Sequence, residues 1–256
     1  MSAPVRIGVQ IQPQHAPNYG HIRDAVRRCE DAGVDVVFNW DHFYPLTGDS
    51  DGAHFECWTM LGAIAEQTER VELGALVTGG GYRNPDLLAD MARTVDHISG
   101  GRLILGIGAG WFEKDYDAYG YEFGTAGSRL KLLGEYLPRI DERLAKLNPP
   151  PVRDIPLLIG GGGERKTLRL VAEYAQIWHS FGDLDTLRRK TGILAEHCAA
   201  VGSDPEQIER STSWPGIPHA EDFVAAGVTL FTVGVSGPDY PLDTVADALR
   251  WRAERD

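Results

Sequence analysis

Hydrophobic positions along the chain follow two different spacings. Short runs rich in valine, isoleucine and leucine, such as residues 5–11 and 103–107, are typical of buried strands. Between these runs, apolar residues recur every three or four positions, as from Leu130 to Leu147, and this spacing predicts amphipathic helices. The predicted strands cover residues 5–11, 34–38, 71–77, 103–107, 155–159, 176–179, 207–213 and 228–233.

A predicted helix follows each predicted strand. Pro85 suits the first turn of one helix, and Gly33, Gly100 and Gly202 are placed to end three of them. The predicted helices cover residues 18–32, 55–68, 85–98, 130–147, 164–173, 187–201, 221–226 and 242–252. The chain therefore consists of eight strand-then-helix units.

This alternation indicates the fold class. Strands that alternate with helices form parallel sheets, and eight units in 256 residues are typical of a TIM-like (β/α)8 barrel. An open, doubly wound parallel sheet is the alternative. No linker rich in proline, glycine or serine divides the chain, so residues 1–256 are predicted to form one domain. Residues 148–151 lead almost directly into the strand at 155–159, which predicts a compact barrel with a shortened connection before strand 5.

Composition narrows the classes of partner. The chain has 25 Lys and Arg against 37 Asp and Glu, a net charge of −12. An acidic protein repels phosphate backbones and anionic membranes, which disfavours nucleic-acid and membrane partners. The first residues lack the pattern of a signal peptide, the longest apolar run spans about ten residues, and the three cysteines form no CxxC motif. We therefore expect a soluble, cytoplasmic protein that acts on a small molecule.

The residues that follow the predicted strands carry the candidate chemistry, because TIM barrels place their active sites at the carboxyl ends of the strands. Asp41 and His42 follow the second strand, and a histidine there can exchange protons near neutral pH. In the alternative interpretation, Asp41 caps a turn and His42 only packs. No HxH pair, GxSxG motif or paired cysteine and histidine indicates a metal site or a nucleophilic hydrolase.

Glycines recur at the same edge. The run at residues 160–163 opens a predicted helix, so its backbone N–H groups are candidates for binding a phosphate, with a flexible turn as the alternative. Glu164, directly after this run, also suits the helix dipole by itself. The Gly-x-Gly-x-Gly pattern at residues 106–110 indicates a close approach of the backbone to a ligand or to a neighbouring loop.

Five stretches of the chain match the pattern of one protein family. They are NWDHF at 39–43, LGALVT at 73–78 with YRNP at 82–85, DHISGGRL at 96–103, GIGAGWFE at 106–113 with AYG at 118–120, and PLLIGGGGE at 156–164. Together they make the whole chain resemble the bacterial luciferase-like superfamily, and within it the oxidoreductases that use coenzyme F420, an 8-hydroxy-5-deazaflavin. The fold of this family is a TIM-like barrel, in agreement with the eight units.

The resemblance implies roles for several residues. His42 would lie by the reactive carbon of the deazaflavin as proton donor or acceptor, and Asp41 would help to orient it. A bulge with a non-prolyl cis peptide would lie behind the ring, at Ala75–Leu76 or one residue later. The glycines after the fifth strand would hold the cofactor phosphate. The residues expected to bind the cofactor are Ala75, Leu76, Val77, Thr78, Gly108, Gly110, Trp111, Gly160, Gly161, Gly162, Gly163, Glu164 and His179.

Two departures from the family pattern limit this comparison. Sugar-phosphate dehydrogenases of the family have a glutamate directly after the fourth-strand Gly-x-Gly, where this chain has Trp111. Relatives often insert a segment before the strand at 155–159 that helps to enclose the substrate pocket, and this chain lacks it. We therefore expect a pocket that is more open, or one that a partner subunit closes.

The sequence thus predicts an oxidoreductase that transfers a hydride between coenzyme F420 and an unidentified organic substrate. Trp40, Phe43, Tyr82 and Trp111 would form an apolar wall against that substrate. The alternatives are an FMN-dependent luciferase-like monooxygenase and a barrel that binds a flavin without catalysis. The resemblance also implies a homodimer, which is a common symmetric assembly.

Overall fold

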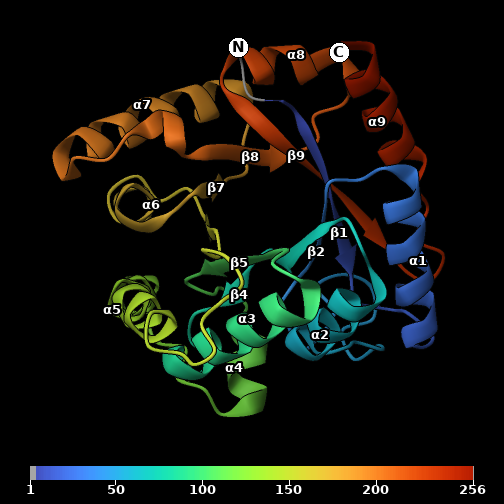
Figure 1. Ribbon diagram of the computed structural model, residues 1–256, viewed down its shortest axis with the longest axis horizontal. Helices are drawn as coiled ribbons and strands as arrows, with labels where there is room; N and C mark the ends of the chain where they lie inside the picture. The colour runs from blue at the N-terminus through green and yellow to red at the C-terminus, as the bar shows by residue number, and fades with distance from the viewer. Residues whose placement is uncertain (1–3, 256) are drawn as a thin grey trace.

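In the computed structural model, which describes residues 4–255, the strands form one closed parallel sheet (Figure 1). Their order is β3-β2-β1-β9-β8-β7-β6-β5-β4, and β3 also pairs with β5. Because β3 and β4 pair in turn with β5, they share one strand position, and the ring has eight positions. The predicted TIM-like barrel is confirmed, and the open doubly wound sheet is wrong because the sheet closes on itself.

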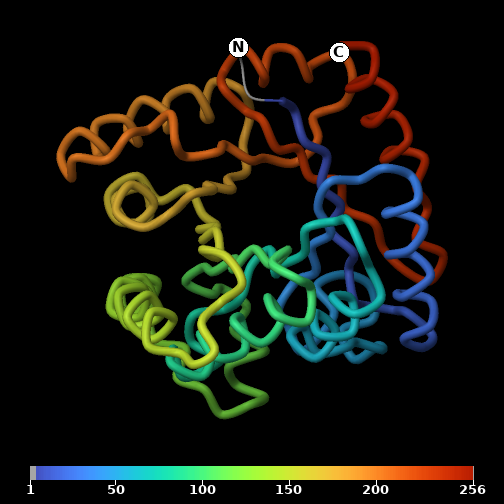
Figure 2. Tube along the Cα trace, viewed as in Figure 1, coloured from blue at the N-terminus to red at the C-terminus, as the bar shows by residue number. Residues whose placement is uncertain are grey.

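The helices lie outside the ring, and the chain circles the barrel once from its blue beginning to its red end (Figure 2). Within residues 4–255, no helix is both long and apolar enough to cross a membrane. The strands are β1 (Arg6–Gln12), β2 (Val36–Asn39), β3 (Glu72–Ala75), β4 (Thr78–Gly79), β5 (Leu103–Gly108), β6 (Leu157–Gly160), β7 (Ile177–His179), β8 (Glu209–Ser213) and β9 (Val228–Ser236). The helices are α1 (Tyr19–Ala32), α2 (Cys57–Gln67), α3 (Pro85–Ser99), α4 (Glu113–Tyr119), α5 (Ala126–Leu144), α6 (Thr167–Tyr174), α7 (Leu184–Val201), α8 (Ile217–Ala225) and α9 (Asp243–Arg255), with a short 3₁₀ helix at Pro205–Gln207.

Local sequence explains most of the helix boundaries. The Asn84 side chain accepts from the backbone N–H of Asp86 at 2.9 Å, Pro85 opens α3, and Gly100 ends it with φ 69°. Other boundaries differ from the prediction. Helix α6 begins three residues later than predicted, and α8 begins at Ile217 rather than 221. Helix α4 was not predicted, because its seven residues are too short for a clear helical period.

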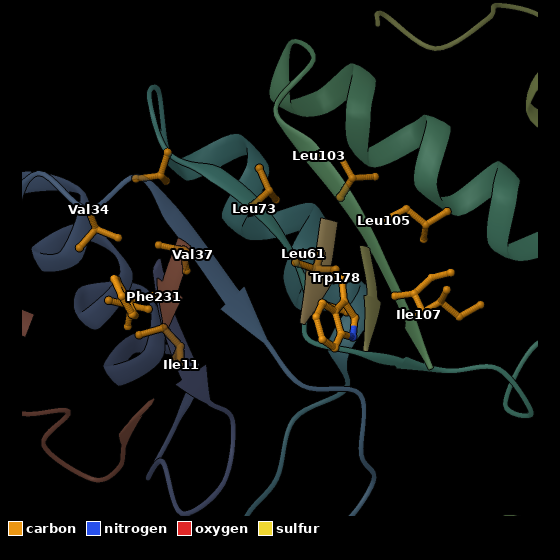
Figure 3. Packing of buried hydrophobic residues seen from close by; sticks show 14 of the residues in the cluster. Ile11, Val34, Val37, Leu61, Leu73, Leu103, Leu105, Ile107, Trp178 and Phe231 are labelled. Carbon is orange, nitrogen blue, oxygen red and sulfur yellow. The ribbon is translucent and has the colours of Figure 1, made fainter. Parts of the chain in front are cut away.

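Side chains along the strands alternate between two cores. On β5, Leu103, Leu105 and Ile107 pack between the sheet and the helices and project to the same side of the strand, whereas Ile104 belongs to the other core (Figure 3). That smaller core collects residues from strands around the ring, so it fills the interior of the barrel. Its buried members are Val36, Phe38, Leu76, Ile104, Leu158, Ile177 and Leu230.

The third strand position is interrupted where β3 and β5 approach closely. A Cβ on Gly74 would overlap the carbonyl oxygen of Ile104, and a Cβ on Gly106 would overlap the carbonyl oxygen of Ala75. Only glycine permits this approach at either position. The strand predicted as continuous over 71–77 is therefore two short strands, with residues 76 and 77 between them.

The shortened connection precedes β6, the fifth strand position of the ring, as predicted. It enters the amino end of β6, and residues 150–157 line a cavity of about 800 Å³ between α5 and α6. None of the residues that line this cavity also lines the one at the carboxyl ends of the strands. This segment of the chain therefore does not line the cavity at the carboxyl ends, and the expected open or partner-closed pocket stays a prediction.

Candidate active site

A cavity of about 710 Å³ opens at the carboxyl ends of the strands, where TIM barrels carry their chemistry. Its wall combines the segments that follow β2, β5, β6 and β7 with the interruption between β3 and β4. The lining residues are Gln10, Trp40, Asp41, His42, Leu46, Leu76, Val77, Gly79, Tyr82, Gly108, Ala109, Gly110, Trp111, Ala126, Arg129, Leu130, Gly160, Gly161, Gly163, Thr167, His179 and Phe181.

A carboxylate from α4 holds the ring of His42. Its Nδ1 lies 2.7 Å from Oδ2 of Asp115, which is fully buried. The Tyr82 hydroxyl donates to the same oxygen at 2.9 Å, and the Phe43 N–H donates to Oδ1 at 3.1 Å. Burial and the Asp115 carboxylate raise the pKa of Tyr82 above its ordinary value, so its hydroxyl remains a donor. With Nδ1 held by Asp115, Nε2 is the nitrogen of His42 that can exchange a proton with a bound molecule.

Aromatic rings surround this histidine. The rings of Trp40, Trp111 and Phe112 meet the His42 ring nearly edge-on, at centroid distances of 5.5–6.0 Å. Of the four aromatic residues predicted to form a substrate wall, Phe43 is not part of the cavity lining and packs against other aromatic rings, whereas the other three line the cavity. These rings make the surroundings of His42 apolar, which strengthens its electrostatic interactions.

Asp41 has a different partner from the expected one. Nη1 and Nη2 of Arg83 both donate to its carboxylate, with Nη2 at 3.0 Å from Oδ1, and Nη2 also donates to Glu56 at 2.6 Å. Burial alone would lower the pKa of Arg83, but the Asp41 carboxylate raises it above its ordinary value, so the guanidinium stays charged. The expectation that Asp41 orients His42 is therefore wrong, since Asp115 holds the ring instead.

Main chain forms the back of the cavity. The peptide bond between Leu76 and Val77 is cis, which confirms the later of the two positions expected for it. The Gln10 amide donates to the Leu76 carbonyl at 2.7 Å, and the Trp58 indole donates to the Thr78 hydroxyl at 2.9 Å. These bonds hold the strand interruption in place on both sides.

The glycine run after β6 forms a loop and not the start of a helix. The Gly161 N–H donates to the carbonyl of His179 at 2.9 Å, so one of the amides expected to bind phosphate is already engaged. Glu164 is part of this loop because α6 begins only at Thr167, and its carboxylate pairs with Arg189.

His179 has an unsatisfied nitrogen at this wall. Its Nδ1 lies 2.8 Å from the Ser211 hydroxyl, whereas its buried Nε2 has no hydrogen-bond partner among residues 4–255. The side chain is 2% exposed, and burial lowers its pKa to about 4, so the ring is neutral at pH 7. His179 also lines an adjoining cavity of about 320 Å³. A ligand in either cavity can supply the missing partner.

Most of the residues predicted to bind a cofactor meet at the main cavity. Four are absent from its lining: Ala75 lies within β3, the Thr78 hydroxyl accepts from Trp58, and Gly162 and Glu164 lie in the loop between β6 and α6. The predicted site residues that do line it are Asp41, His42, Leu76, Val77, Gly108, Gly110, Trp111, Gly160, Gly161, Gly163 and His179.

Two charged residues of the site were missed in the sequence. Asp115 lies on the unpredicted helix α4, and no local motif links it to His42. Arg129 lines the cavity, but its guanidinium donates to the carbonyls of Gly110 and Phe123, both at 3.0 Å. The apolar spacing from Leu130 to Leu147 predicted the helix that Arg129 precedes. Because this helix follows the Gly-x-Gly-x-Gly segment in the chain, the sequence could have placed Arg129 near this wall.

Sequence comparisons identify related proteins. The profile of the family described as luciferase-like monooxygenase matches residues 1–226. The F420-dependent glucose-6-phosphate dehydrogenase of Amycolatopsis mediterranei is 31% identical over 170 residues, 58% of this chain and 48% of that protein. An uncharacterised protein of Mycobacterium tuberculosis is 29% identical over 251 residues, 86% of each chain. The chain spans about half the length of two curated relatives, 48% of the dehydrogenase and 56% of another M. tuberculosis protein.

Solved structures share the fold. An F420-dependent secondary alcohol dehydrogenase in complex with an F420–acetone adduct aligns with a TM-score of 0.84 at 18% identity. A coenzyme F420-dependent tetrahydromethanopterin reductase from Methanopyrus kandleri and a monooxygenase from Streptomyces bottropensis both align with a TM-score of 0.75, at 17% and 15% identity. Each alignment covers 97% of this chain and 98% of the other. At these identities the likeness establishes the barrel and not the reaction.

Proposed function

Because the chain belongs to the luciferase-like monooxygenase family, we propose that it is an oxidoreductase that transfers a hydride between coenzyme F420 and an unidentified organic substrate. The observation that carries the proposal is His42, whose ring is fixed by Asp115 at the wall of an apolar cavity. Relatives and structural neighbours that are named for their dependence on F420 support the choice of cofactor.

The residues present fit a deazaflavin. A cavity of about 710 Å³ lies within the range of roughly 300–1,000 Å³ that is usual for ligand and cofactor sites. Leu76 and Val77 provide an apolar surface and a main-chain edge for a flat ring system. The buried Nε2 of His179 is a polar atom that a ligand would satisfy, since no other group in the described chain does so.

Each side of the cavity would have a separate task. When bound, the deazaflavin supplies a ring carbon that accepts or donates the hydride. His42 would give or take a proton through Nε2, and the Asp115 carboxylate would stabilise its ring when both nitrogens carry protons. Trp40 and Trp111 would exclude water, while the main chain of Leu76 and Val77 would position the ring.

A binding titration with F420 and FMN side by side tests this proposal. We expect F420 to bind more tightly than FMN, followed by oxidation or reduction of bound F420 with a member of a panel of alcohols, ketones and unsaturated carbonyl compounds. Preferred binding of FMN with oxygen consumption would instead indicate a monooxygenase. F420 binding without turnover on any panel member would indicate a barrel that has lost catalysis.

A further inference from the structure

We propose that Lys190, on α7, binds the phosphate of the cofactor, and that Gly162 is the position that lets it reach the loop after β6. The inference rests on the proposed function for the identity of the cofactor. Neither residue lies on the cavity lining, but Gly161 and Gly163 on either side of Gly162 do. A phosphate bound between Gly162 and Lys190 would therefore lie at the edge of the cavity in which we place the ring.

The geometry at Gly162 brings two neighbouring strand–helix units together. The point that a Cβ on Gly162 would occupy is overlapped by Nζ of Lys190 and lies 2.9 Å from Oγ of Ser180. Gly162 follows β6, whereas Ser180 and Lys190 follow β7. Any larger residue at 162 would displace the ammonium group, so the absence of a side chain permits its contact with the loop.

Lys190 differs from its charged neighbours on the helix. Arg189 pairs with Glu164, and Arg188 lies 3.9 Å from Asp185. In the part of the chain that the structure describes, no carboxylate lies within ion-pair distance of Nζ of Lys190, and this nitrogen donates no hydrogen bond to a protein group. A half-buried cation without a counter-ion, in a protein of net charge −12, is suited to bind an anion.

A second polar group at the same point also lacks a strong partner. Ser180 is 2% exposed, and its hydroxyl makes only a long bond of 3.4 Å to the carbonyl of Phe181. The preceding residue, His179, lines the main cavity, and its buried Nε2 has no partner among the residues placed in the structure. Buried polar groups are normally satisfied, so this group of residues indicates a site that a ligand completes.

The test compares two ligands that differ in one phosphate-bearing tail. Dissociation constants for F420 and for 8-hydroxy-5-deazariboflavin, the fragment without the phosphate, are measured by cofactor fluorescence for the wild type and for Lys190→Met. Loss of one charge-assisted contact should weaken F420 about 10–100-fold and leave the fragment within about twofold. Lys166→Met is the matched control, because it removes the same charge from an exposed position on the loop that carries Gly162 and should change neither constant more than about threefold.

Gly162→Ala tests the steric part of the inference. Alanine keeps the backbone N–H but places a methyl group where Nζ of Lys190 lies. The variant should therefore lose affinity for F420 and not for the fragment, as Lys190→Met does. The double variant should lose no more affinity for F420 than the single variant with the larger loss, because both changes remove the same contact.

Several results would overturn the inference. They are equal losses for F420 and for the fragment, no loss for F420 in Lys190→Met, or the same loss in Lys166→Met. If the wild type binds FMN and not F420, the proposed cofactor is wrong, and the same comparison with FMN and riboflavin then decides the role of Lys190 independently. If the wild type binds neither phosphate-bearing ligand more tightly than its phosphate-free fragment, the edge of the cavity between Gly162 and Lys190 is not a phosphate site.

Discussion

The two sides of the cavity are built from different groups. On the side of β2, β3 and β5, charged side chains hold one another: Asp115 holds His42, and Asp41 holds Arg83. On the side of β6 and β7, glycine main chain forms the wall, and the polar atom Nε2 of His179 has no partner in the described chain. The charged groups of the first side are paired without a ligand, whereas the second side leaves a buried polar atom of the cavity wall without a partner.

This difference separates two requirements of an enzyme site. A group that exchanges protons needs a fixed position before the substrate arrives, because reorganising it during the reaction would raise the activation free energy. A loop that binds a cofactor gains affinity from groups that only the ligand satisfies. Substitutions on the β2 side should therefore affect turnover and stability, and substitutions on the β6 side should affect binding.

The largest effect is expected at His42. His42→Ala should lower turnover by roughly 10²–10⁴-fold, the usual contribution of a positioned acid or base, while the dissociation constant of the cofactor changes only a few-fold. The comparison uses steady-state turnover with the substrate found in the panel, together with a cofactor titration. His97→Ala, an exposed histidine on α3, is the control and should keep full turnover. Unchanged turnover in His42→Ala would remove it from the mechanism.

The next largest effect is on stability, at Arg83. Arg83→Met leaves the carboxylate of Asp41 buried and without its counter-ion, which should lower the free energy of unfolding by about 3–5 kcal/mol. Urea unfolding measures the change. Arg139→Met is the matched control, since its pair with Asp86 is exposed and should contribute no more than about 1 kcal/mol. Equal losses in the two variants would contradict the view that the β2 side is held by buried charge.

A smaller effect is expected at Asp115. Asp115→Asn keeps an oxygen that can accept from Nδ1 of His42 but removes the negative charge, which should lower turnover about 10–100-fold. Cofactor affinity should stay within a few-fold, because Asp115 does not line the cavity. Tyr82→Phe removes a donor to the same oxygen without removing the charge and should have the smaller effect on turnover. Wild-type turnover in Asp115→Asn would show that holding the ring is not needed for the reaction.

The fold and one side of the site were predictable for a common physical reason. The spacing of apolar residues and the residues that form turns are local features of the sequence. The eight units, the start of α3 at Pro85 and the position of His42 after β2 therefore follow from neighbouring residues. A barrel then gathers all the strand ends at one edge. The location of the candidate site therefore followed from the order of the elements alone.

The contacts within the site were not predictable in the same way. Asp115 lies 73 residues from His42, on a helix too short to give a periodic signal. Asp41 is adjacent to His42 in sequence, yet its carboxylate is bound by Arg83, 42 residues away. In the run of cations on α7, only packing shows that Lys190 faces the loop while Arg189 pairs with Glu164. Long-range pairing of charges depends on the folded geometry, which one sequence does not encode locally.

The smallest effect concerns the pH dependence of stability at His179. Burial lowers its pKa to about 4 in the folded protein, against an ordinary value of 6.5. Between these values the unfolded chain binds more protons, so the free energy of unfolding should fall as the pH falls from 6.5 towards 4, by on the order of 1–2 kcal/mol from this residue. His179→Asn cannot take up that proton, so its stability should fall less steeply over the same window. Urea unfolding at several pH values measures the slope of the free energy of unfolding against pH for both proteins. Equal slopes would show that Nε2 of His179 is solvated and is not a buried atom that a ligand satisfies.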